Sequence, residues 1–213
     1  MNTEAYRELK VLEHVSDNAN LTQRRLAKEL EVALGLVNLL VRRVVKKGYV
    51  KLVNVQKNRI RYLITPQGIA EKTRLTYQFL EYSLNLHRRV RQLLKENLAR
   101  VAAVGGRNVA LIGTGEVAEL AYLTLKEMDM NLVAIVDDQA AGATFLGQPV
   151  PSFETLAHVL FDCGIVGSLN GSVEQLRSRL QAIGVPEEKI LLIEQRGPRI
   201  QAVVLGRETR DGR

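Results

Sequence analysis

Hydrophobic positions recur at helical spacing along one long stretch of the chain. Its large apolar residues lie four, three, four, four and three positions apart, the spacing of a helix face that packs against another helix: Leu75, Phe79, Tyr82, Leu86, Val90 and Leu93. The stretch begins at Thr65, a capping hydroxyl, followed by Pro66 at the first helical position. We predict a helix that joins two domains and pairs two chains. The alternative is an ordinary core helix interrupted near Asn85.

Three shorter helices and two strands are predicted before this stretch. Apolar spacing indicates helices over 3–16, 22–30 and 34–47, with Thr22 as an N-cap and Gly48 closing the third. The third helix has one apolar side, formed by Val37, Leu40, Val41 and Val44. Residues 49–55 and 60–64 are typical of strands joined by a polar tip. Three helices and a hairpin predict a winged helix-turn-helix domain.

The opposite side of the third helix has the residue types that duplex DNA requires. Gly35 permits close approach, the Asn38 amide can read a base edge, and Arg42 and Lys46 can contact guanine or phosphate. The alternative is a solvated basic face. The candidate DNA-binding residues are Thr22, Gln23, Arg24, Gly35, Asn38, Leu39, Arg42, Arg43, Lys46, Lys57, Asn58, Arg59 and Arg61.

Charge supports a polyanionic partner for the first half only. The net charge is +7, but residues 1–100 have 20 Lys and Arg against 9 Asp and Glu, whereas residues 101–213 have 10 against 14. A hydrophobic content of 46% suffices for a core in each of two domains. No signal peptide or membrane-length apolar run is present, so we expect a cytoplasmic protein. The single cysteine excludes an internal disulfide, and the three scattered histidines indicate no metal site.

The first half also resembles a known family. The segments 23–30, 34–38, 47–51 and 62–76 are similar to MarR-type regulators associated with bacterial exopolysaccharide gene clusters, over about residues 5–95. The resemblance implies a winged-helix regulator of transcription. Two features depart from the family: Ala33 stands where a capping serine is usual, and the wing tip is shorter.

The second half alternates buried strands with helices, which predicts a doubly wound parallel sheet. A strand over 108–112 leads into a G-x-G-x-x-A turn and a helix, and a strand over 132–136 ends in two aspartates. This is the setting of the dinucleotide fingerprint, in which the acid holds a ribose hydroxyl. The alternatives are that the turn binds nothing and that Ser168 only caps the next helix. The candidate nucleotide-binding residues are Gly113, Thr114, Gly115, Glu116, Val117, Asp137, Asp138 and Ser168.

Residues 108–193 further resemble the Rossmann-like, nucleotide-sugar-associated domains of polysaccharide biosynthesis proteins. The similar segments are 113–116, 136–138 and 146–151, whereas Ala118 replaces the usual third glycine of the fingerprint. The resemblance implies a nucleotide sugar as the ligand. Tyr122 and Lys126 mimic a dehydrogenase pair, but they lie on the helix directly after the glycine turn and are discounted.

The sequence therefore predicts an α/β protein of two domains. Its parts are a winged helix-turn-helix domain (1–66), a long linking and dimerisation helix (67–104), a Rossmann-like ligand-sensing domain (105–195) and a C-terminal tail (196–213). We expect a homodimeric transcriptional regulator of exopolysaccharide or capsule genes that binds an inverted repeat in double-stranded DNA. No essential cofactor and no catalytic residues are predicted. The alternatives are a Rex-type repressor that senses NAD(H), and a nucleotide-sugar enzyme with the winged helix as a protein-docking module.

Overall fold

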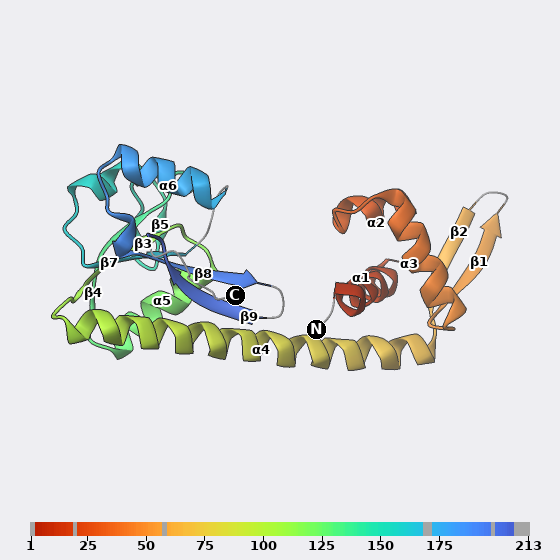
Figure 1. Cartoon of the computed structure of the whole chain (residues 1–213). Coiled ribbons are helices and arrows are strands. Elements are labelled where there is room, and N and C mark those ends of the chain that lie inside the picture. Colours follow the sequence, from red (N-terminus) through yellow and green to blue (C-terminus); the bar gives the residue numbers. More distant parts are fainter. Residues whose placement is uncertain (1–2, 19–20, 57–58, 168–171, 197–198, 207–213) are drawn as a thin grey trace, which may run out of the picture. The chain divides into compact units, whose positions relative to one another are not determined.

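The chain forms two compact units, residues 1–85 and 86–213 (Figure 1). The structure, a computed structural model, describes residues 3–18, 21–56, 59–167, 172–196 and 199–206. One helix, α4 (Pro66–Ala103), belongs to both units and is unbroken through Asn85. Each unit has its own core and is described by itself.

The first unit contains the three predicted helices and the predicted hairpin. The helices are α1 (Thr3–Asp17), α2 (Gln23–Glu29) and α3 (Leu34–Lys46), and the antiparallel strands are β1 (Val50–Gln56) and β2 (Arg59–Ile64). The apolar side of α3 is buried, as predicted, because Val37, Leu40, Val41 and Val44 pack with residues of α1, α2 and α4. The order of helices and the hairpin match the predicted winged helix-turn-helix.

Local capping chemistry sets the ends of these helices. The Thr22 hydroxyl accepts a hydrogen bond from the Arg25 backbone N–H at 3.2 Å, which confirms it as the N-cap of α2. Gly48 has a φ of +76°, and its N–H donates to the Val45 carbonyl at 2.9 Å. The predicted left-handed end of α3 is therefore confirmed.

The start of α4 is fixed tightly to the junction between α3 and β1. The Thr65 hydroxyl accepts from the Gly68 N–H at 3.0 Å and donates to the Gly48 carbonyl at 2.6 Å. A Cβ atom on Gly68 would lie 2.1 Å from the Tyr49 carbonyl oxygen. Only a glycine permits this approach. The helix α4 begins where the Thr65-Pro66 pair predicts, and its first turn is held against the residues that lead into the wing.

The predicted apolar seam of α4 is occupied within the chain at two of its positions. Leu75 is buried in the core of the first unit, and Val90 is buried in the core of the second with Leu94 and Leu98. Leu75 and Val90 therefore do not face a second chain, contrary to the sequence prediction. The exposed large apolar residues of this part of α4 are Ile69, Tyr77, Phe79, Leu80 and Leu84, and of these Phe79 belongs to the predicted seam.

The second unit is built on a five-stranded sheet in the order β4-β3-β7-β8-β9. The strands β3 (Asn108–Ile112), β4 (Asn131–Val136), β7 (Cys163–Val166) and β8 (Ile190–Arg196) are parallel, as predicted. The fifth, β9 (Arg199–Val204), pairs antiparallel with β8. The sheet is therefore mixed, which corrects the all-parallel prediction: β8 and β9 are nearly contiguous, and a short connection permits only an antiparallel pair.

Helices cover both faces of this sheet (Figure 1). On β3, Val109 and Leu111 join the core that contains α4 and α5 (Glu116–Glu127). The alternate residues Ala110 and Ile112 join the core that contains η1 (Phe153–His158) and α6 (Val173–Ala182). The remaining elements are the short strands β5 (Thr144–Phe145) and β6 (Gln148–Pro149) and the 3-10 turn η2 (Glu187–Lys189). The Rossmann-like classification of this unit stays a prediction.

Within the described ranges, no helix is both long and apolar enough to cross a membrane.

Candidate functional sites

The outer face of α3 is the candidate DNA-reading surface of the first unit. Gly35, Leu39, Arg42 and Lys46 are exposed and Asn38 is half-buried, while the opposite side of the helix lies in the core. A Cβ on Gly35 would meet no atom within 4 Å, so the backbone is open to a partner at this point. The face therefore combines an accessible backbone, an amide and two cations, which suits a base edge with flanking phosphates.

The predicted residues of α2 have different surroundings. The Thr22 hydroxyl is engaged in capping, and Gln23 donates from Nε2 to the Tyr62 hydroxyl on β2 at 3.1 Å. Arg24 is exposed. Gln23 therefore connects α2 to the wing, and the exposed Arg24 is accessible to a phosphate.

Two basic residues at the end of α3 are paired with α1. Arg43 forms an ion pair with Glu4, and Lys47 donates to both oxygens of Glu8 at 2.8 and 2.9 Å. Glu8 is itself buried. Glu4 therefore partly neutralises the charge of Arg43, a predicted DNA contact, whereas Lys47 has a structural role that the sequence pattern did not reveal.

The candidate DNA-binding residues of the wing are described only in part. Arg61 on β2 is half-buried and already has an interaction within the chain. Arg59 is the first residue of β2. The predicted contacts Lys57 and Asn58 lie outside the described residues.

Ala33 leaves the N-terminus of α3 without a side-chain cap. Its backbone has the extended N-cap conformation (φ −62°, ψ 142°), and its carbonyl accepts from the Leu36 N–H at 3.0 Å. We expect Ala33→Ser to stabilise the first unit by about 1 kcal/mol, because a hydroxyl here accepts from a free N–H of the first turn. Urea unfolding of both proteins measures the change. Ala33→Val is the matched control and lacks the gain; an equal effect of both substitutions would contradict the capping explanation.

The glycine turn of the second unit is bound to its own aspartate. Asp137 is buried, and its Oδ2 accepts from the backbone N–H and the hydroxyl of Thr114 at 2.9 and 2.8 Å. Its Oδ1 accepts from the Gln139 N–H at 3.0 Å. The carboxylate predicted to hold a ribose therefore holds the turn between β3 and α5 in this structure.

The second aspartate faces a cavity of about 240 Å³ at the carboxyl ends of β3 and β4. Asp138 accepts from the Phe153 N–H at 2.9 Å and pairs with Arg179 of α6 at 2.6 Å. The Arg179 guanidinium lies 3.9 Å from the centre of the Phe153 ring. These interactions hold the pKa of the Asp138 carboxyl below its usual value, through the backbone hydrogen bond first and the arginine second.

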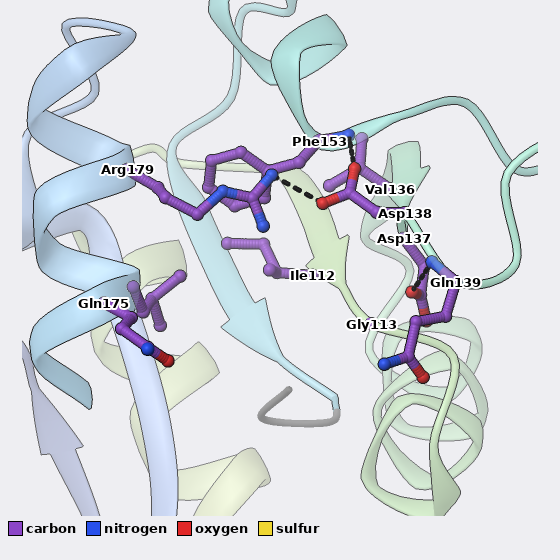
Figure 2. Close-up of a pocket in the computed structure, with 10 residues that line it drawn as sticks. Ile112, Gly113, Val136, Asp137, Asp138, Gln139, Phe153, Gln175 and Arg179 are labelled. Carbon is purple, nitrogen blue, oxygen red and sulfur yellow. Dashed lines mark hydrogen bonds and ion pairs between the residues drawn. The ribbon is translucent and has the colours of Figure 1, made fainter. Parts of the chain in front are cut away.

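Figure 2 shows how this cavity is formed. Arg179 and Gln175 extend from α6 on one side, and Gly113 and Gln139 lie on the other. The structure thus brings Gly113, Asp137 and Asp138 together, as predicted. Arg179, Phe153 and Gln175 were not predicted, because they are distant in sequence and have no motif of their own.

The other predicted nucleotide contacts surround the start of α5. Gly115 is its N-cap residue without a side-chain hydrogen bond, and Glu116 is exposed in the first turn. Val117 is half-buried against the core. A Cβ on Gly167 would lie 2.5 Å from the Ala118 Cβ and 2.7 Å from the Gly113 carbonyl, so the turn packs closely against the end of β7. Ser168 lies outside the described residues.

The part of the chain that the structure describes contains no group of three or more His, Cys, Asp or Glu residues arranged to hold a metal ion.

Two segments of the chain match known families. Residues 5–51 match the family model described as winged helix-turn-helix DNA-binding, and residues 105–191 match the one described as C2185-like, N-terminal. No curated protein matches the chain.

Several solved structures are similar to parts of the chain. One is the MarR family protein Rv2887 of Mycobacterium tuberculosis in complex with p-aminosalicylic acid, which is 22% identical over 33% of this chain and 55% of its own, with a TM-score of 0.30. Another is the MepR–DNA complex of Staphylococcus aureus, which is 22% identical over 49% of this chain and 77% of its own, with a TM-score of 0.35. The chain thus spans about half the length of the first of these proteins.

The family match covers all three helices and the start of the hairpin, and the second strand completes the wing. The amino-terminal unit of this chain is therefore a winged helix-turn-helix DNA-binding domain.

Proposed function

We propose that the protein is a homodimeric transcriptional regulator that reads an inverted repeat through α3. The observation that carries the proposal is the outer face of α3, where Asn38, Arg42 and Lys46 lie opposite a buried apolar face in a winged helix-turn-helix domain. In such domains the recognition helix enters the major groove. The excess of basic residues in the first hundred positions supports the same partner.

The residues on this face have separate proposed roles. Asn38 and Arg42 read base edges, since an amide pairs with adenine and a guanidinium with guanine. Lys46, Lys57, Arg59 and Arg61 contact phosphates, which adds affinity for any sequence and makes binding sensitive to salt. Gly35 and Leu39 lie among these residues and face the major groove. The same surface is flanked by Thr22, Gln23, Arg24 and Arg43.

We expect Arg42→Ala to weaken binding of the preferred DNA by about 1–3 kcal/mol and to relax selectivity at one base position. Lys46→Ala should weaken all sequences alike and reduce the salt dependence. Fluorescence anisotropy on specific and scrambled duplexes separates the two effects. Arg88→Ala is the matched control, because Arg88 is an exposed arginine of α4 outside the winged-helix unit. Unchanged affinity and selectivity in Arg42→Ala would refute the docking of α3.

The proposed dimer forms through the first part of α4. Tyr77, Leu80 and Leu84 are 69%, 51% and 47% exposed and lie on one side of the helix, at intervals of three and four residues. We propose a second copy of this chain as their partner, because two recognition helices related by a twofold axis read an inverted repeat. Half-sites about 34 Å apart would accept the two helices on one side of the duplex.

The second unit is proposed to be a Rossmann-like sensor of a small nucleotide-containing molecule, with a nucleotide sugar favoured. Its candidate site is the cavity beside Gly113, Asp138 and Arg179 at the carboxyl ends of the strands, where open α/β sheets bind ligands. At about 240 Å³ the cavity is small for a complete nucleotide sugar, so binding requires Arg179 to leave Asp138. Regulation of exopolysaccharide or capsule genes is proposed on the resemblance of both halves.

Ligand titrations test the sensor. We expect a UDP-sugar to raise the melting temperature of the protein, by the linkage between binding and stability, and Arg179→Gln to remove most of that shift. NADH and NAD serve as competing candidates, since a response to NADH alone would support the Rex-type alternative. Acyl-CoA is a further comparison. No response to any compound would favour a glycine turn that binds nothing, and turnover of a nucleotide sugar would support the enzyme alternative.

A further inference from the structure

A second cavity of the C-terminal unit lies at the opposite edge of the sheet from Asp138 and Arg179. It occupies about 410 Å³ at the amino ends of β7 and β8, beside the last turns of α4. This volume falls within the range of small-molecule pockets. Its lining residues all belong to the second unit, and the site is separate from the proposed nucleotide site.

One wall of this cavity is apolar. Val101 comes from α4, Val104 from the turn directly after it, Ile190 and Leu191 from β8, and Val204 from β9. Val104, in the turn directly after α4, is 85% exposed although it is a large aliphatic residue. An apolar molecule in the cavity would cover this side chain, and removing apolar surface from water is favourable.

The polar side of the cavity offers cations. Arg100 is exposed, and within the described residues no ion pair joins it to a carboxylate. Lys189 donates one hydrogen bond from Nζ to the Phe161 carbonyl at 3.0 Å, which leaves two of its three N–H donors for another acceptor. Both residues line the cavity.

The lining also contains two carboxylates, Asp162 and Glu188. Asp162 accepts at one oxygen from the backbone N–H groups of Asn108 and Arg107, at 2.9 and 2.8 Å, and these bonds, with a smaller contribution from the nearby charge of Lys189, hold its pKa below the usual value. The Glu188 side chain lies against Gly206, with atoms 3.1 and 3.2 Å from where a Cβ would stand. Asp162 is therefore engaged by backbone donors, and Arg100 and Lys189 are the charged lining groups that carry N–H donors for a ligand head.

We infer that this cavity binds a small amphiphilic carboxylate, with its apolar body against Val101, Val104 and Val204 and its carboxylate at Arg100 and Lys189. Guanidinium and ammonium groups form strong, charge-assisted hydrogen bonds with carboxylates. The site is lined by Asn97, Arg100 and Val101 of α4, the helix that begins in the winged-helix unit. A ligand here acts on the helix that both units share.

Calorimetric titration of the full-length protein without DNA tests this inference independently of the proposed function. The probes are octanoate, octanol and octylamine, which share an alkyl chain and differ in the head group. Octanoate should bind at least tenfold more tightly than octanol, because a hydrogen bond to a charged group adds to the apolar contact. Equal affinity for octanoate and octanol, tighter binding of octylamine, or no binding of octanoate would overturn the assignment.

Variants locate the binding site. Arg100→Gln should reduce octanoate affinity about tenfold and leave octanol unchanged. Val104→Glu, at a strongly exposed position, should reduce octanoate affinity at least tenfold, because it removes an apolar contact and adds a like charge. The matched controls are Arg88→Gln, at another exposed arginine of α4, and Arg179→Gln, at the other cavity. Loss of octanoate binding in either control, or retention of full affinity in Arg100→Gln, would contradict the proposed site.

Discussion

Leu80→Glu combined with Leu84→Glu is expected to convert the protein to a monomer and to lower its affinity for an inverted repeat by roughly 100-fold or more. Both leucines are about half exposed on α4, so glutamate fits the isolated chain. In a dimer the same positions would bury carboxylates, which is costly without partners. In a dimer, binding of one winged helix holds the other at a high effective concentration near the second half-site. A monomer lacks this gain in affinity.

Sedimentation velocity measures the oligomeric state, and anisotropy with one-site and two-site duplexes measures the affinity. Gln78→Glu combined with Asn85→Glu is the matched control, since both residues are exposed and lie about 100–160° around the helix from the leucines. It adds the same charge, so it corrects for repulsion from DNA. A variant at Leu80 and Leu84 that remains dimeric would exclude this face as the interface, and a monomeric wild type would exclude the dimer.

Gly68→Ala is expected to destabilise the first unit by about 3 kcal/mol. The added methyl group would lie 2.1 Å from the Tyr49 carbonyl oxygen, which also accepts from the Thr65 N–H at 2.9 Å. Relief of the clash requires moving α4 away from the end of α3 or breaking this hydrogen bond. Because these contacts position the wing, DNA affinity should fall together with stability.

Hydrogen exchange of the full-length protein, followed peptide by peptide, measures this loss in the first unit separately from the second. Gly35→Ala is the matched control, because a Cβ there meets nothing within 4 Å and alanine favours a helix. It should slow exchange in α3 or leave it unchanged. Exchange in residues 1–85 that is the same in Gly68→Ala and the wild type would show that the close approach to Tyr49 is not required.

The helices of the first unit could be predicted because their signals are local. The Thr22 cap, the left-handed Gly48 and the Thr65-Pro66 start each depend on residues within a few positions of one another. The core side of α3 followed from helical periodicity alone. Such periodicity does not identify the packing partner, which is why Leu75 and Val90 were assigned to a chain-pairing seam although they are buried within their own units.

The candidate sites were predictable only in part. The glycine turn and the two aspartates form a short motif, and the structure brings them to one edge of the sheet. The partners of these aspartates come from distant segments: Arg179 lies on α6, and Phe153 begins η1. The same holds for the pairing of Arg43 with Glu4, 39 positions away. Long-range partners of this kind depend on the packing of whole elements, which a single sequence pattern does not specify.

Selection of bound sequences from a random pool of double-stranded DNA tests the central claim most directly. The account predicts enrichment of an inverted repeat with half-sites about one turn of the duplex, roughly 34 Å, apart. It further predicts that Arg42→Ala selects a motif with one degenerate position in each half. A pool that shows no enrichment at low salt, or a single unrepeated site that Arg42→Ala leaves unchanged, would contradict the account.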